Sequence, residues 1–99
     1  MKNITPNELK CWQSDNKKFI LLDVREDWER NAYNIGGAHI PFGELMVRKN
    51  ELDAKATIVL YCEKGIRSAI AIQRLGEYGF KDLYNLEGGM AAWRKNEVQ

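Results

Sequence analysis

Two short apolar runs constrain the fold of this chain more than any other feature of its sequence. Residues 19–24 read Phe-Ile-Leu-Leu-Asp-Val and residues 58–61 read Ile-Val-Leu-Tyr, and neither run alternates apolar with polar side chains. Strands of this kind are buried on both faces, which is the usual situation in a parallel sheet. Residues 83–86 form a further predicted strand, so we predict three parallel strands.

Helical segments precede and separate these strands. The first helix is expected to begin near Pro6, because Thr5 and Glu8 have the spacing of a capping box. Others are predicted at residues 25–30, 42–50, 68–78 and 90–95. The expected core-facing residues of the helix at 68–78 are Ala69, Ile72, Leu75 and Tyr78, with Gly79 ending it. Strands that alternate with helices predict an α/β fold, in which helices cover both faces of a parallel sheet.

The composition is that of an ordinary globular domain. The 99 residues suffice for one domain, placed at residues 1–99, and 44% of them are hydrophobic and 29% charged. A net charge of +1 gives no pull toward nucleic acid or membranes. No apolar stretch approaches the roughly 20 residues that span a bilayer, and the N-terminal segment lacks the apolar core of a signal peptide. We therefore expect a cytoplasmic protein with no nucleic-acid or membrane partner.

The two cysteines, Cys11 and Cys62, lie in different contexts. Cys11 falls inside an amphipathic helix, where a half-buried packing role is expected. A disulfide between the two is not expected in a chain of cytoplasmic character. One histidine and two cysteines also give no basis for a structural zinc site.

Polar residues follow each predicted strand. Asp23 and Arg25 end the first strand, Cys62 ends the second, and residues 87–89 follow the third. Because the carboxyl ends of parallel strands meet at one edge of the sheet, where binding sites form, we expect these residues to lie close together. Residues 87–89 are expected to shape the wall of a pocket there.

The loop that begins at Cys62 joins the second strand to a helix. Such a loop can turn its backbone N–H groups inward, and these donors would stabilise a thiolate on the cysteine. Gly65 permits the tight path, and Ser68 could cap the helix or donate to the sulfur. Lys64 and Arg67 add positive charge, and Arg67 offers the fork of N–H groups that grips an oxyanion. A lone cysteine at a strand end is usually inert, but this combination predicts a nucleophile that meets an anionic substrate.

This loop resembles the Cys-x-x-Gly-x-Arg-Ser active-site loop of the rhodanese family of sulfurtransferases. Its residues here are Cys62, Glu63, Lys64, Gly65, Ile66, Arg67 and Ser68. Residues 21–26 resemble the first signature of that family, and residues 86–90 with Trp93 resemble its last. The resemblance runs from about Thr5 to Trp93. It implies a single rhodanese-like α/β/α domain with a central parallel sheet.

The resemblance also implies that Cys62 accepts a sulfane sulfur as a persulfide and passes it on. The thiolate would attack the outer sulfur of thiosulfate or of a donor persulfide, while Arg67 and Lys64 guide the small anionic donor. Cyanide, a thiol or a sulfur-carrier protein would then accept the sulfur, and the two half-reactions predict ping-pong kinetics. Asp23 and Arg25 are expected to brace the loop. No metal or organic cofactor is needed.

One segment departs from the common family pattern. Many members read His-Ile-Pro-Gly-Ala where residues 34–38 of this chain read Asn-Ile-Gly-Gly-Ala. His39 comes too late to be that histidine, so we expect it to be a surface or packing residue and not a general base. The variant segment is similar to rhodanese domains fused to adenylyltransferases of sulfur-transfer pathways, which favours a protein or small-molecule thiol as acceptor.

Two other functions stay open at this point. Phosphatases of the cell-cycle type share the fold, but their loops have five residues between cysteine and arginine, whereas four separate Cys62 from Arg67. A noncatalytic interaction module is the second alternative. Inactive relatives usually lack the cysteine, which this chain keeps, so the sequence favours activity.

Overall fold

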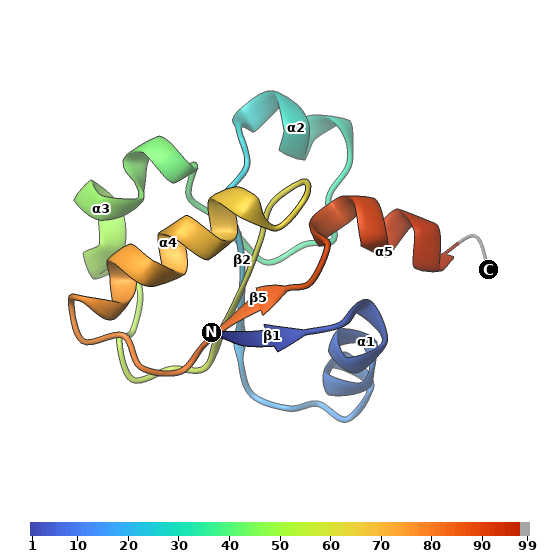
Figure 1. The fold of residues 1–99 in the computed structure, drawn as a ribbon, viewed down its shortest axis with the longest axis horizontal. Coiled ribbons are helices and arrows are strands. Elements are labelled where there is room, and N and C mark those ends of the chain that lie inside the picture. Colours follow the sequence, from blue (N-terminus) through green and yellow to red (C-terminus); the bar gives the residue numbers. More distant parts are fainter. Residues whose placement is uncertain (98–99) are drawn as a thin grey trace.

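A five-stranded parallel sheet forms the centre of the computed structural model, which describes residues 1–97 (Figure 1). The strands are β1 (Lys2–Ile4), β2 (Ile20–Asp23), β3 (Ala38–His39), β4 (Ile58–Tyr61) and β5 (Leu83–Leu86), in the spatial order β1-β5-β4-β2-β3. Every neighbouring pair is parallel. The predicted α/β class and the three predicted strands are therefore confirmed.

The edge strands β1 and β3 do not follow from the apolar runs. Ile4 is the one buried residue of β1, and β3 has no buried residue. Both strands form through backbone pairing with a neighbour, which places Ile4 opposite Leu86 and Ala38 opposite Leu22. Short, polar edge strands are common because they limit pairing with other chains, and they leave no hydrophobic pattern in the sequence.

The connections between strands are mostly helical. They contain α1 (Pro6–Ser14), α2 (Asp27–Ala32), α3 (Leu45–Arg48) and α4 (Ile66–Gly76), and α3 lies between the 3₁₀ turns η1 (Phe42–Glu44) and η2 (Lys49–Glu51). The last helix, α5 (Gly89–Glu97), follows β5. The predicted capping box is present, since Thr5 Oγ1 accepts the Glu8 N–H and the Glu8 carboxylate accepts the Thr5 N–H. No helix within residues 1–97 has the length and apolar character needed to cross a bilayer.

Helices cover both faces of the sheet, as Figure 1 shows. On one face α3 and α4 pack on side chains that include Leu22 and Leu60, and on the other α1 and α5 pack on side chains that include Leu21 and Val59. Successive residues of a strand point to opposite faces, so each apolar run supplies both cores. The continuous runs in β2 and β4 are the consequence of this double burial.

The core-facing side of α4 agrees with the predicted one in part, since Leu75 is buried and Ile72 packs partly buried against the core. Ser68, Ala71 and Leu75 are its buried residues, whereas Tyr78 is 57% exposed and lies beyond the end of the helix. The predicted residues were three apart throughout, and a spacing of three drifts around a helix of 3.6 residues per turn. The helix also begins at Ile66, two residues earlier than predicted, because Gly65 rather than Ser68 is its N-cap.

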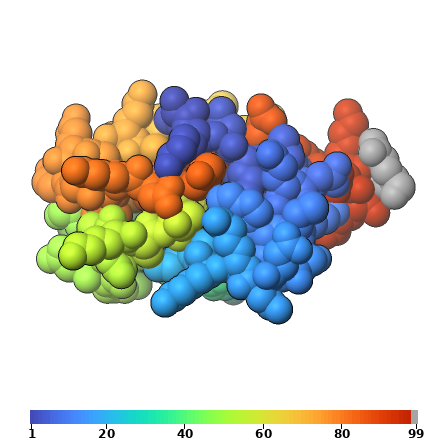
Figure 2. Space-filling view, turned by 90° about the horizontal axis from the view of Figure 1, so that it is seen from below, coloured from blue at the N-terminus to red at the C-terminus, as the bar shows by residue number. Residues whose placement is uncertain are grey.

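Figure 2 shows the face at the amino ends of the strands. Segments near residues 18, 55 and 82 lie side by side there, and the Ile58 N–H donates to the Asp82 carbonyl at 3.0 Å. The Asp82 carboxylate accepts hydrogen bonds from Lys2 Nζ and from the Thr57 hydroxyl, each at 2.5 Å. Exposed polar groups thus join the amino ends of β1, β4 and β5.

Candidate active site

Cys62 directly follows β4, and its loop leads into α4 at the carboxyl edge of the sheet (Figure 1). The thiol sulfur accepts the Gly65 N–H at 3.1 Å and the Ser68 N–H at 3.4 Å. The loop can turn these groups inward because Gly65 has a φ of +88°, in the left-handed region that glycine adopts without strain. Two backbone donors therefore point at the sulfur of Cys62, a residue that is only 1% exposed.

Ser68 and Asn85 form a polar pair beneath the sulfur. The Ser68 hydroxyl oxygen lies 3.3 Å from Cys62 Sγ and 2.5 Å from Asn85 Oδ1. Asn85 Nδ2 donates to the Gly65 carbonyl at 3.0 Å, which leaves Oδ1 as the acceptor of the serine proton. When the serine proton points to Asn85, a protonated thiol can donate to the Ser68 oxygen, and the geometry allows either atom of this contact to be the donor. Ser68 does not cap α4, because Gly65 is the N-cap. Its backbone N–H donates to the sulfur, and donation from its hydroxyl group to the sulfur stays a prediction.

The first turn of α5 donates hydrogen bonds to the backbone of the Cys62 loop. The Met90 N–H donates to the Cys62 carbonyl and the Ala91 N–H to the Glu63 carbonyl, both at 2.9 Å. A Cβ on Gly89 would lie 2.4 Å from the Cys62 carbonyl oxygen, and the φ of Gly89 is +59°. This glycine is therefore needed for the close approach of helix and loop.

The pocket at Cys62 is lined by residues of the loop and of α2. The lining residues are Glu29, Cys62, Glu63, Lys64, Ile66 and Arg67. Residues 87–89, predicted to shape its wall, are not among them, because the β5–α5 turn lies under the loop backbone instead of beside the thiol.

Asp23 and Arg25 form a buried ion pair at the end of β2. The Arg25 Nε donates to Asp23 Oδ1 at 3.0 Å and Nη2 donates to Oδ2 at 3.1 Å, with both side chains at most 1% exposed. Arg25 Nη1 lies 4.0 Å from a Glu63 carboxylate oxygen, and Nη2 donates to the Tyr33 carbonyl at 2.6 Å. The pair thus connects β2, the segment after α2 and the Cys62 loop.

Arg67 is not free to bind a substrate anion in this structure. Its Nη1 and Nη2 donate to the two carboxylate oxygens of Glu29, at 2.8 Å and 2.9 Å. The hydrogen bond to Arg67 lowers the pKa of Glu29 to about 2, so that this carboxylate is ionised throughout the neutral range. The guanidinium fork that was expected to grip an anionic donor is therefore occupied by Glu29 in the resting site, and the role of Arg67 in guiding a donor stays a prediction.

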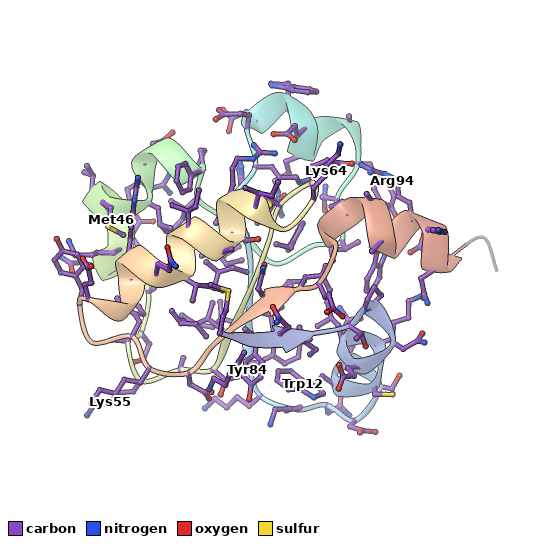
Figure 3. The ribbon with its side chains drawn as sticks, viewed as in Figure 1. Trp12, Met46, Lys55, Lys64, Tyr84 and Arg94 are labelled. Atoms are coloured by element: carbon purple, nitrogen blue, oxygen red, sulfur yellow. The ribbon has the colours of Figure 1, made fainter. Side chains whose placement is uncertain are left out.

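The other charged residues around the mouth of the pocket differ in whether they are paired. Glu63 accepts two hydrogen bonds from Arg94, at 2.5 Å and 3.2 Å, which links the loop to α5. Lys64 is exposed and forms no ion pair with a residue in the described part of the chain. Figure 3 shows Lys64 on the loop and Arg94 nearby on α5. Ile66, which begins α4, is 66% exposed and adds an apolar element to the same rim.

His39 and Cys11 lie in structural or exposed positions. The His39 Nε2 donates to the Arg25 carbonyl at 2.7 Å, since a carbonyl can only accept. Cys11 is exposed, and the predicted half-buried role is wrong because Leu9 is the residue by which α1 reaches the core. Both cysteines are free thiols. Within residues 1–97, no group of three or more His, Cys, Asp or Glu side chains is arranged to hold a metal ion.

The sequence reasoning did not identify Glu29, Asn85 or Arg94. Glu29 and Arg94 resemble any other charged residue on a surface helix, so their partners become visible only after folding. Asn85 carried a signal, because it is a polar residue inside the apolar strand β5 and is 7% exposed. A buried amide needs hydrogen-bond partners, and those of Asn85 are in the Cys62 loop.

Comparisons with known proteins agree with this geometry. A family model described as a rhodanese-like domain matches residues 5–96. The chain is 31% identical over 90 residues to the thiosulfate sulfurtransferase GlpE of Coxiella burnetii, covering 89% of this chain and 84% of GlpE. The crystal structure of a rhodanese-like domain protein from Staphylococcus aureus superposes with a TM-score of 0.86 at 34% identity, covering 94% of this chain and 91% of that one.

A longer relative shares the same region. The chain is 38% identical over 96 residues to the probable adenylyltransferase/sulfurtransferase MoeZ of Mycobacterium tuberculosis H37Rv, covering 93% of this chain and 24% of MoeZ. It therefore spans about a quarter of that protein's length. With most of its residues matched by the family model and by GlpE, the chain belongs to the rhodanese-like domain family.

Proposed function

We propose that this chain is a cytoplasmic sulfurtransferase that carries a sulfane sulfur as a persulfide on Cys62. One observation carries the proposal: the sulfur of Cys62 accepts the N–H groups of Gly65 and Ser68 and lies in the wall of a pocket. Fixed donors of this kind stabilise negative charge, and the thiolate is the form of cysteine that attacks. The family and the sulfurtransferase names of GlpE and MoeZ support the same chemistry.

The reaction has two half-reactions. In the first, the thiolate attacks the outer sulfur of thiosulfate or of a persulfide, a new S–S bond forms on Cys62, and the bond to sulfite or to the donor thiolate breaks. In the second, cyanide, a thiol or a sulfur-carrier protein attacks the terminal sulfur and releases the Cys62 thiolate. The electrons balance within these two displacements, so neither step requires an oxidant or an organic cofactor.

The contacts of Cys62 favour this function over the two alternatives. A noncatalytic module has no need for backbone donors directed at a thiol, yet Gly65 and Ser68 supply them. A phosphatase requires a cradle for a tetrahedral dianion, whereas the loop is short and Arg67 is engaged by Glu29.

Intact-mass measurement tests the proposal. After incubation with thiosulfate or with a small organic hydropersulfide, the protein should gain the mass of one sulfur atom, and cyanide should remove it. The Cys62→Ser variant should gain none, because its hydroxyl is a far weaker nucleophile, whereas Cys11→Ser should load sulfur as the unmodified chain does. Loading that depends on Cys11, or no loading from either donor, would overturn the proposal.

A further inference from the structure

The ion pair between Glu29 and Arg67 closes one side of the Cys62 pocket. It joins α2 to the first turn of α4, and both residues line the pocket together with Cys62. The Glu29 side chain is 10% exposed and that of Arg67 is 33% exposed. The contact is bidentate, with each terminal nitrogen of the guanidinium facing one carboxylate oxygen, and this is the geometry in which an arginine binds a carboxylate most firmly.

Glu29 is itself held in place. Its Oε1 also accepts the Glu26 N–H at 3.0 Å, as part of the capping box at the start of α2. The carboxylate is therefore fixed by its own helix as well as by Arg67. A substrate anion that needs the same face of the guanidinium must displace this intramolecular carboxylate.

The neighbouring cations cannot readily replace Arg67 as the group that binds a substrate anion. Arg94 is bound by Glu63, and Arg25 is buried against Asp23. Lys64 is exposed on the loop and presents a hydrated ammonium group without a fixed geometry (Figure 3). The mouth of the pocket thus contains positive charge, but its one forked donor is already occupied.

We propose that Glu29 is a specificity-determining residue, which by holding Arg67 weakens the binding of anionic donors such as thiosulfate and favours donors that present the outer sulfur as a neutral hydropersulfide. This inference rests on the proposed sulfurtransferase function. With such a donor, R–S–SH, the Cys62 thiolate attacks the outer sulfur, the R–S bond to that sulfur breaks, and R–S⁻ leaves as Cys62–S–SH forms. The R–S⁻ group then takes a proton from solvent.

The first test uses two alkylating agents that differ in charge and needs no sulfur transfer. Iodoacetate is an anion and iodoacetamide is neutral, and both alkylate the Cys62 thiolate by the same displacement. In a Cys11→Ser background, Glu29→Gln should raise the ratio of the iodoacetate rate to the iodoacetamide rate by about tenfold, the factor that corresponds to one hydrogen-bonded charge contact. The glutamine keeps an oxygen that can accept the Glu26 N–H, so the start of α2 is preserved.

Glu63→Gln is the matched control. It removes the same charge from the lining of the same pocket but leaves the pair of Glu29 with Arg67 intact. Its rate ratio should change by less than about twofold, because Arg94, the cation that it releases, does not line the pocket and the remaining effect of a partly exposed charge is screened by solvent. In the double variant Glu29→Gln, Arg67→Gln, the increase in the ratio of the iodoacetate rate to the iodoacetamide rate should disappear. Glu29→Asp, whose shorter side chain cannot make both bonds, provides a second route if Glu29→Gln does not fold, and it should also raise the ratio.

The second test measures sulfur loading by intact mass. The ratio of the thiosulfate loading rate to that of a small organic hydropersulfide should rise in Glu29→Gln, mainly through a lower KM for thiosulfate. An unchanged alkylation ratio in Glu29→Gln, or an equal rise in Glu63→Gln, would overturn the role of Glu29 even if Cys62 loads sulfur. If the alkylation ratio shifts but Cys62 loads no sulfur from any donor, the proposed function fails instead.

Discussion

The ion pair at the carboxyl end of β2 is buried, whereas the ion pair at the amino ends of β1 and β5 lies in solvent. Asp23 and Arg25, at the carboxyl end of β2, are 0% and 1% exposed. Lys2 and Asp82, at the amino ends of β1 and β5, are 48% and 41% exposed. Both ends thus use charged side chains to connect neighbouring segments, but of these two ion pairs only the one at the carboxyl end is out of water.

This difference follows from what each end must hold. At the carboxyl end, Arg25 binds a carboxylate and a backbone carbonyl and lies near Glu63 of the loop that carries Cys62. Groups buried in this way have few alternative positions, because moving them would leave a charge without a partner. The Cys62 loop is therefore held against buried groups that have little freedom to move. At the amino end, Asp82 joins strands that carry no reactive group, and its contacts can exchange with water.

The largest expected effect comes from breaking the buried pair. Asp23→Asn should lower the free energy of unfolding by about 3–5 kcal/mol, because it leaves the Arg25 guanidinium buried without its counter-charge. Asp82→Asn makes the same chemical change at the other end and should cost no more than about 1 kcal/mol, as expected for an exposed pair. Urea denaturation at neutral pH measures both.

Equal losses in these two variants would remove the distinction between the ends of the sheet. A loss in Asp23→Asn that is restored by the additional change Arg25→Met would support it, since the second change removes the unpaired charge.

A smaller effect is expected from the glycine under the loop. Gly89→Ala should destabilise the fold by about 2–3 kcal/mol, because the new Cβ meets the Cys62 carbonyl oxygen and the backbone keeps a positive φ. Sulfur loading of Cys62 should fall as well, since the loop must move. Gly76→Ala is the control: it lies at the far end of α4 with no atom within 4 Å of the added Cβ, and should leave stability equal or slightly higher. Thermal unfolding with intact-mass assays would detect both changes, and normal loading in Gly89→Ala would contradict the close approach.

The sequence predicted the centre of the fold better than its edges. The strands β2 and β4 were predictable because double burial forces a continuous apolar run, and helix α1 because Thr5 and Glu8 show its start. The edge strand β3 was not predictable, since it is two residues long and is defined by its backbone bonds to β2. Predictions from side-chain hydrophobicity cannot detect a strand that is defined only by its backbone hydrogen bonds.

The same contrast applies to the candidate site. The position of Cys62 after a buried strand and the turn at Gly65 followed from local sequence, because a strand, a glycine and a helix start are adjacent in the chain. The engagement of Arg67 did not, because its partner Glu29 is 38 residues away and becomes a neighbour only when α2 folds over the loop. The expectation that Arg67 grips an anionic donor therefore did not include this intramolecular partner.

The smallest of these effects is a pH dependence of stability that originates in Glu29. The hydrogen bond from Arg67 lowers the pKa of Glu29 from 4.5 to about 2 in the folded state. A carboxyl group with a lowered folded pKa stabilises the fold fully above its unfolded pKa, and this contribution is lost as the pH falls toward the folded pKa. The difference in unfolding free energy between the unmodified chain and Glu29→Gln should therefore be constant above about pH 5 and shrink by about 1–2 kcal/mol between pH 4.5 and pH 2.

Asp82→Asn should show a weaker change over the same range, because the pKa of that exposed carboxyl is lowered mainly by its hydrogen bond to Lys2, which water can replace. Urea denaturation at a series of pH values gives both curves, and a flat difference for Glu29→Gln would show that Arg67 and Glu29 are not paired in solution.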